Sequence, residues 1–174
     1  MSEKNIPLLE EIIDKGNLII KSLSSLPIQE SITRISEIMP KHILTVFFAD
    51  YLKFEVNNGG YSQFFYNSRG LYNSLVEKAL TNLGAKEFLK RHQDFILFIK
   101  KNQKLAKEFL KVGYFEDKTG FRDQIDTAMG TKFNDHFDFF DLRPKLLGFL
   151  FDYAEKHNLE LKKELSEDIL SYTN

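Results

Sequence analysis

Few residues in this 174-residue sequence have the types and spacing that catalysis or metal binding requires. The four histidines are His42, His92, His136 and His157, and none stands in a metal-ligand spacing such as HExxH. His136 is the strongest candidate for chemistry, because Asp135 and Asp138 flank it. A hydrolase built on His136 and nearby carboxylates is therefore one alternative, although a histidine beside an aspartate is more often an ordinary surface residue.

Other catalytic signatures are absent from the sequence. Cysteine is missing altogether, which excludes disulfides, thiolate nucleophiles and thiolate zinc sites. No GxSxG nucleophile elbow, GxxxxGK[ST] phosphate loop or GxGxxG dinucleotide fingerprint occurs. Asp138 and Asp141 stand at i and i+3, but pairs of this kind are common on charged surfaces. We therefore expect a protein that is not an enzyme and that carries no metal or cofactor.

The most informative local pattern is the corner Asn57-Asn58-Gly59-Gly60. Two glycines after two asparagines favour left-handed backbone conformations, so we expect a helix to end here and a short helix to follow. The asparagine side chains can bond backbone groups that the broken helix leaves unsatisfied. The corner is first a structural feature, and a binding role stays open.

The short helix after the corner should be amphipathic. Gln63 and Asn67 stand four residues apart and should share one polar face, with Tyr66 near them. Phe64 and Phe65 can point towards the core. A polar face beside a tight corner is a second candidate binding surface.

The carboxyl-terminal third of the chain is acidic. Residues 114–174 hold 8 Lys or Arg against 13 Asp or Glu, whereas residues 1–113 hold 16 against 12. Between Glu116 and Asp141 acids interleave with phenylalanines, which should anchor the backbone while the acids face water. Fixed negative charge of this kind selects basic partners. The candidate partner-binding residues are Glu116, Asp117, Asp123, Asp126, Asp135, Asp138 and Asp141.

A lysine run gives the opposite charge earlier in the chain. Its members have helical spacing and are Lys100, Lys101, Lys104, Lys107 and Lys111. Because no dense basic cluster with interleaved aromatics stands out, a solvated helix face is favoured over a nucleic-acid groove. We expect no direct nucleic-acid binding.

Apolar residues recur at helical intervals along most of the chain, which predicts an all-α fold. The predicted helices cover residues 9–23, 28–38, 43–56, 71–83, 86–112 with an interruption near Asn102, 146–154 and 161–170. The third should lie at the centre of the core, because its apolar arc is too wide for a surface helix. The run Phe137–Asp141 is predicted to be a loop or a helical turn.

Size and composition agree with one globular domain. The chain has 43% hydrophobic residues, with 17 Phe and no Trp, which indicates an aromatic core in a compact multi-helix bundle. The amino terminus lacks the apolar run of a signal peptide, and Ile43–Ala49, the longest apolar stretch, is far short of the ~20 residues of a membrane span. We expect a cytoplasmic protein with no membrane contact.

Three runs of sequence resemble the bacterial DNA-mimic protein domain family. They are FEVNNGGYSQFFYNSRG (Phe54–Gly70), ALTNLGA (Ala79–Ala85) and FNDHFDFFDLRPKLLGFLFDYAEKH (Phe133–His157). In that family an NNGG-aromatic-x-QFF-x-N core precedes a helix that ends in an IGA-like triplet, and an acidic-aromatic segment leads into the penultimate helix. The resemblance covers about residues 47–157. Helices at 5–39 and 160–172 are expected to pack on this core within one domain, 1–174.

The resemblance implies a compact all-helical bacterial protein whose acidic surface imitates the phosphate charges of DNA and occupies a DNA-binding regulator. Related domains also resemble immunity proteins that neutralise bacterial toxins. The family motif falls here on Asn57, Asn58, Gly59, Gly60, Gln63, Phe64, Phe65, Tyr66 and Asn67.

Three interpretations therefore remain. The first is a module that docks a basic protein, either a DNA-binding regulator or a toxin, through the acids between Glu116 and Asp141. The second is a module whose contacts centre on Gln63, Tyr66 and Asn67. The third is the hydrolase. The sequence leaves open whether the protein is a monomer or a homodimer.

Overall fold

The computed structural model describes residues 6–130 and 138–168, and all regular secondary structure within these residues is helical. The prediction of an all-α fold is confirmed. The described helices are α1 (Ile6–Ser22), α2 (Ile28–Ile38), α3 (Lys41–Ser68), α4 (Asn73–Leu83), α5 (Lys86–Lys101), α6 (Gln103–Val112), α7 (Phe121–Met129), α8 (Asp138–Lys156) and α9 (Asn158–Ser166).

Proline, glycine and asparagine set several helix ends where the sequence predicts them. Pro27 precedes α2 and Pro40 precedes α3, each with the extended backbone that proline favours. α4 ends because Gly84 adopts a left-handed φ of 68°, from which its N–H reaches the carbonyls of the last turn. The predicted interruption at Asn102 separates α5 from α6.

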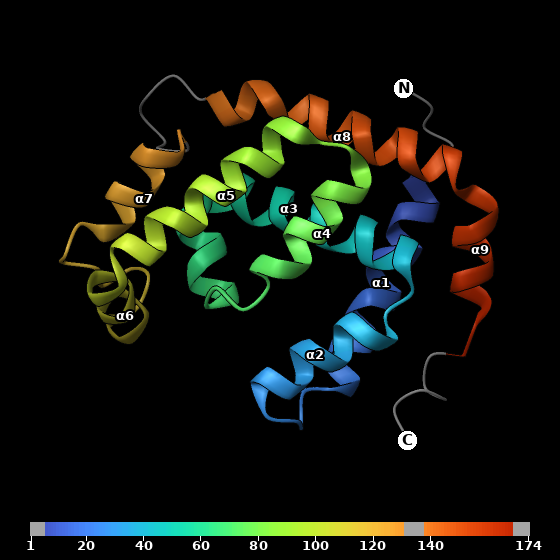
Figure 1. Ribbon diagram of the computed structural model, residues 1–174, viewed down its shortest axis with the longest axis horizontal. Coiled ribbons are helices and arrows are strands. Elements are labelled where there is room, and N and C mark those ends of the chain that lie inside the picture. Colours follow the sequence, from blue (N-terminus) through green and yellow to red (C-terminus); the bar gives the residue numbers. More distant parts are fainter. Residues whose placement is uncertain (1–5, 131–137, 169–174) are drawn as a thin grey trace.

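Helix α3 lies in the middle of the molecule, as its sequence predicts. It contacts α1, α4, α7, α8 and α9, while α8 runs along one side of the molecule (Figure 1). Every residue from Ile43 to Ala49 is buried, so no face of this stretch reaches solvent. None of the described helices combines the length and apolarity needed to cross a bilayer.

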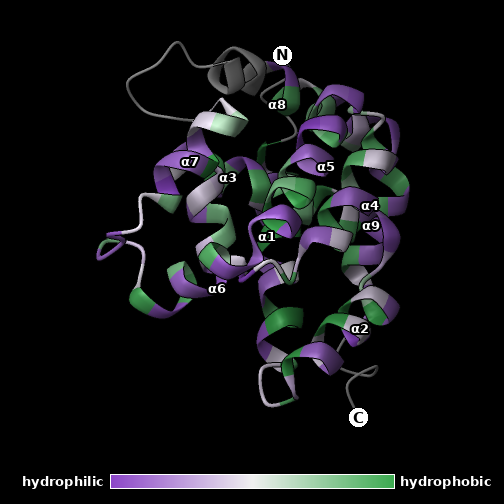
Figure 2. Ribbon diagram, turned by 60° about the vertical axis from the view of Figure 1, so that its left-hand side comes forward, coloured by the Kyte–Doolittle hydropathy of each residue, from purple (hydrophilic) through white to green (hydrophobic). Residues whose placement is uncertain are grey.

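Aromatic rings fill the core between α3 and α5. Tyr61 and Phe64 of α3 pack against Phe95 of α5, with ring centroids 5.0 and 5.8 Å from that of Phe95. Hydrophilic and hydrophobic residues alternate along the surrounding helices, as expected when each helix buries one stripe (Figure 2). The 17 Phe of the sequence predict an aromatic core, and the phenylalanines described in this region form one.

A single histidine is buried in this aromatic cluster. His92 has no exposed surface, and its Nε2 donates to the backbone carbonyl of Asn73 at 3.3 Å. Its Nδ1 has no hydrogen-bond partner among the described residues. Burial lowers the pKa of His92 to about 4, because the charged imidazolium would lose its hydration, and the bond to Asn73 offsets this only in part.

The first prediction concerns this histidine. Between pH 6.5 and about 4 the unfolded chain binds a proton at His92 and the folded chain does not, so folding stability should fall as the pH is lowered through this window. The expected loss below pH 4 is about 3 kcal/mol. His92→Phe should remove it, as measured by urea unfolding from pH 7 to pH 4. The difference between wild type and variant should be constant above pH 6.5, and a difference that stays constant down to pH 4 would contradict the assignment.

Candidate protein-binding site

The Asn57–Gly60 corner divides α3 into two helical halves. Gly59 has φ −166° and ψ 26°, and Gly60 has φ 78° and ψ −176°, so neither continues the helix. The predicted break is confirmed, but the left-handed backbone occurs at Gly60 alone, since the φ of Gly59 is extended. The conformation of Gly60 is nearly exclusive to glycine.

An acid from another helix fills the space beside Gly60. A Cβ atom on Gly60 would lie 2.3 Å from Oδ1 of Asp126 in α7. The same carboxylate accepts the backbone N–H of Ser62 at 2.9 Å and the hydroxyl of Ser62 at 2.5 Å. Asp126 therefore caps the first turn of the second half of α3, where backbone N–H groups lack helical partners and the helix dipole favours negative charge.

The expectation that Asp126 faces water is wrong. Only 6% of Asp126 is exposed, and its carboxylate accepts the N–H of Ser62 inside the fold. The sequence offers no signal for this pairing, since the two residues are 64 positions apart.

A second buried carboxylate joins the two halves of α3. Oε2 of Glu55, before the corner, accepts Nε2 of Gln63 at 3.0 Å and Nδ2 of Asn67 at 2.7 Å, both after the corner. Gln63 and Asn67 thus share one face, as predicted. Burial, followed by the neighbouring charge and hydrogen bond of Glu55, raises the pKa of Tyr51. The side-chain amides of Gln63 and Asn67 therefore stabilise the kink through Glu55, and this structural role is separate from any contact with a partner.

Aromatic packing holds the outer side of the corner. The hydroxyl of Tyr114 donates to the carbonyl of Gly59 at 2.9 Å, and its ring lies 5.8 Å from that of Tyr66. Arg122 of α7 stands over the Tyr114 ring, 5.0 Å from its centroid. Phe64 and Phe65 are buried, as predicted. The connection between α6 and α7 is thereby tied to the corner.

Asn67 also borders a hollow in the surface. The hollow has a volume of about 310 Å³ and lies between α1, α2 and the α3–α4 connection. Isoleucines of α1 and α2 and leucines of the connection between them form its apolar wall, and Arg69 lines it beside Asn67. Arg69 has a left-handed backbone, with φ 52°, that ends α3. Asn67 is exposed despite its bond to Glu55, so a partner can reach this part of the motif.

The remaining described acids of the predicted docking segment differ in their exposure to solvent. Glu116 and Asp123 are exposed, as a docking role requires. Asp117 is partly buried, and its carboxylate accepts hydrogen bonds from Thr119 and from the N–H of Arg122 at the start of α7. Burial alone would raise the pKa of Asp117, but these hydrogen bonds outweigh it and lower the pKa. Asp117 therefore orders the connection that leads into α7.

Three acids of the same segment lie outside the described part of the chain. Asp135 is among residues 131–137, which the structure does not describe, and the side chains of Asp138 and Asp141 are likewise outside the described residues. Their role in partner docking stays a prediction. His136 also lies outside the described residues, so the structure does not test the hydrolase alternative.

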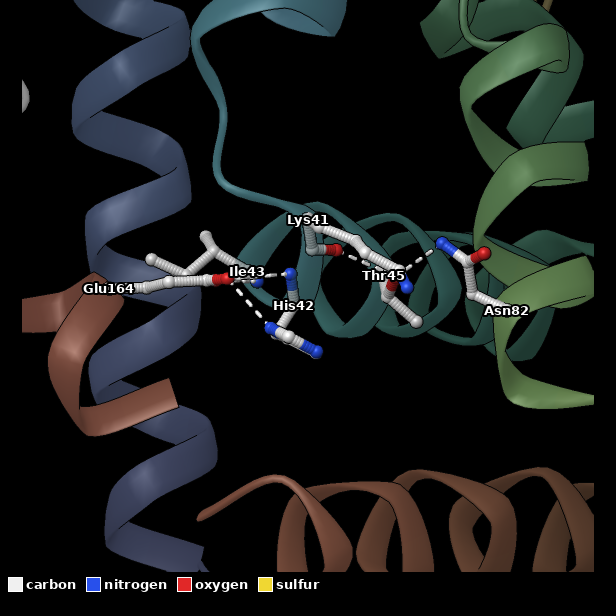
Figure 3. Close-up of polar contacts among 6 residues, drawn as sticks. All are labelled: Lys41, His42, Ile43, Thr45, Asn82 and Glu164. Carbon is white, nitrogen blue, oxygen red and sulfur yellow. Dashed lines mark hydrogen bonds and ion pairs between the residues drawn. The ribbon is translucent and has the colours of Figure 1, made fainter. Parts of the chain in front are cut away.

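One histidine–carboxylate pair is described, and it holds α9 against α3 (Figure 3). Oε2 of Glu164 in α9 accepts the N–H groups of His42 and Ile43 at 3.0 Å, and Oε1 lies 2.7 Å from Nδ1 of His42. Pro40 precedes the helix and provides no side-chain cap, so Glu164 supplies it from a distant helix. The Glu164 carboxylate thus caps the start of α3 and links α9 to it.

A second histidine stacks on this pair. The rings of His42 and His157 lie 4.7 Å apart. Burial, followed by the charge of His42, lowers the pKa of His157. Among the described residues, no group of three His, Cys, Asp or Glu side chains is arranged to hold a metal ion.

Comparison with known proteins identifies a family. The model of a family described as DMP19-like protein matches residues 37–157, which is more than half of the chain. The matched region includes the α3 corner, Glu55, Asp126 and α7. Searches of curated proteins and of solved structures give no significant match.

The second prediction concerns the corner. Gly60→Ala should destabilise the fold by about 1 to 3 kcal/mol, because its φ of 78° strains any L side chain and its Cβ would strike the Asp126 carboxylate. Thermal or urea unfolding measures this effect. Gly148→Ala in α8 is the matched control, since a Cβ there meets nothing within 4 Å and alanine favours a helix by up to about 1 kcal/mol. Equal stability of Gly60→Ala and wild type would refute the strained corner.

Proposed function

The chain belongs to the DMP19-like protein family, and from this membership we propose that it is a non-enzymatic DNA-mimic protein that docks a basic protein partner. The partner class is a DNA-binding regulator, whose DNA-binding surface is basic by necessity. The proposed contact surface is the acidic carboxyl-terminal third. Family membership over residues 37–157 is the observation that carries this proposal.

Charge distribution supports the choice of surface. Residues 114–174 hold 13 acids against 8 bases, although the whole chain has a net charge of only −1. A nearly neutral protein can still steer a basic partner when its acids are gathered on one part of the surface. Most of the excess comes from Glu116–Asp141, which hold seven acids against three bases, so the proposed docking surface is this segment rather than the whole carboxyl-terminal third.

Within this third, α7 offers a rigid base for exposed acids. Phe121, Ile125 and Met129 are buried on its inner side, and Asp126 and Asp117 fix the helix to the corner and to the preceding connection. Asp123 points outward on the same helix, and Glu116 is exposed just before it. Charges on a rigid support lose little entropy on binding, which favours selective docking.

The proposed docking set is smaller than the sequence alone predicts. Glu116 and Asp123 stay in it, together with Asp135, Asp138 and Asp141, for which the proposal rests on sequence position. Asp126 is removed, and Asp117 contributes through the shape of the connection.

A second docking surface is centred on Gln63, Tyr66 and Asn67. The hollow of about 310 Å³ beside Asn67 favours it, because a partner side chain can enter an apolar hollow with polar groups at its edge. The two surfaces differ in their response to salt, since apolar contact is screened little and charge contact strongly.

The third prediction follows from this difference. Replacing Glu116 by Gln and Asp123, Asp135, Asp138 and Asp141 by Asn should lower the association rate with the partner on the order of 10-fold at low salt and flatten its salt dependence. The substitutions of the exposed Glu116 and Asp123 should change folding little, because exposed charges contribute about 0 to 1 kcal/mol each, and thermal unfolding measures the effect of the whole set. The partner is first captured from the native host, identified by mass spectrometry, and tested for release by its own DNA site.

A variant with the same charge change on other helices is the control. It carries Glu10→Gln, Asp14→Asn, Glu30→Gln, Glu87→Gln and Asp94→Asn, all at exposed positions of α1, α2 and α5. It should bind as the wild type does. Should the docking variant also bind like the wild type at both low and high salt, its acids are a solvated face and the Asn67 surface becomes the better candidate.

A further inference from the structure

A concentration of exposed basic residues lies at the end of the molecule opposite to α9 (Figure 1). It comprises the exposed lysines of the C-terminal turn of α5, of α6 and of the following connection, which we call the lysine face. Its members are Lys100, Lys101, Lys104, Lys107, Lys111 and Lys118. Glu108, Glu116 and Asp117 are the acids within the same stretch of sequence.

The lysines on α6 form one row. Lys104, Lys107 and Lys111 stand three and four residues apart, so they share a stripe and follow one another about 4.5 and 6 Å along the helix axis. Ala106 and Phe109, on the other side of α6, are buried in the core. No ion pair joins any lysine of the row to another described residue. The exposed Glu108 stands four residues after Lys104 and three before Lys111, so it lies on the same stripe, and the row presents three positive charges against one negative charge.

An exposed aromatic ring accompanies the lysine face. Phe115 is 88% exposed, and it lies between Lys111 and Lys118 in the connection from α6 to α7. Its ring packs edge-on against Tyr114, with centroids 5.2 Å apart, and Tyr114 is itself bonded to Gly59. One side of Phe115 is thus supported by an anchored ring, while the rest meets solvent.

We propose that the lysine face and Phe115 bind single-stranded nucleic acid, with phosphates along the lysine row and a base stacked on Phe115. A row of cations beside a supported aromatic ring is the arrangement that binds single strands with little sequence preference. The sequence alone favours a solvated face, because it does not reveal the exposure of Phe115. A solvated face has no need of an exposed phenylalanine.

A membrane surface fits the same residues less well. A helix that binds a bilayer buries its apolar face among the lipids. The apolar face of α6 is already occupied by Ala106 and Phe109 inside the core. The apolar groups available beside the lysines are therefore separate side chains rather than one helix face: Phe115, Val112 and, near Lys100 and Lys101 on α5, Leu97. Anionic vesicles are therefore a competing probe in the test.

The fourth prediction is the test of this proposal, using fluorescence anisotropy of the full chain with a labelled oligothymidylate of about 16 nucleotides. The dissociation constant should be on the order of 10⁻⁵ M at moderate salt. A plot of its logarithm against the logarithm of the salt concentration should have a slope of about 3.5, the value for five lysines in contact with phosphates. Replacing Lys104, Lys107 and Lys111 by Gln should reduce the slope by about 2. Phe115→Ser should weaken binding about 5- to 100-fold and leave the slope unchanged.

The control replaces Lys156, Lys162 and Lys163 by Gln, which removes equal charge from exposed positions of α8 and α9. It should bind oligothymidylate as the wild type does, and thermal unfolding should be alike in all variants. Absence of binding at about 50 mM salt, or equal losses in the control and the lysine-row variant, would overturn the proposal. Binding to anionic vesicles without binding to oligothymidylate would also overturn it, in favour of a lipid surface. Because no basic protein takes part, the outcome is independent of the docking proposed for the acidic third.

Discussion

The contact between Asp126 and Ser62 is the constraint on which the rest of the structure depends. A central helix cannot turn through Gly59 and Gly60 without exposing the N–H groups of the helical half that follows, and a buried N–H without a partner costs about 1 to 3 kcal/mol. Asp126 accepts one of them, the N–H of Ser62, from α7, together with the Ser62 hydroxyl. The same carboxylate leaves no room for a side chain at Gly60, so the corner and α7 specify each other.

Periodicity in the sequence predicts the elements that pack by apolar contact, and it misses those that depend on distant polar partners. The ranges of α2, α4, α5 and α6 follow from stripes of apolar residues and from proline, glycine or asparagine at their ends. The sequence pattern does not predict helix α7, although Phe121, Ile125 and Met129 recur at four-residue intervals, because a segment of nine residues is too short for a clear helical period. Carboxylates are usually solvated, so neither Glu55 nor Asp126 carries a local sign of burial.

Most residues of the family motif have a structural role in the fold rather than an exposed one. Its glycine allows the turn, its phenylalanines enter the core, and its amides hold Glu55 across the kink. A motif of this kind can persist in a family whose members bind different partners, because it maintains the frame and leaves the outer surfaces free to vary. The acids around α7 and the lysine face are such surfaces. Both are mounted on elements that the corner fixes in place.

Hydrogen exchange at the backbone amide of Ser62 is the most direct test of this account. If Asp126 caps the second half of α3 in a buried site, the Ser62 amide should be protected as strongly as the amides of the buried core around Phe64, and opening should require most of the global unfolding free energy. Asp126→Ala should lower its protection while the amides of α4 keep theirs relative to global stability. Exchange of the wild-type Ser62 amide at the rate of an exposed loop would contradict the account.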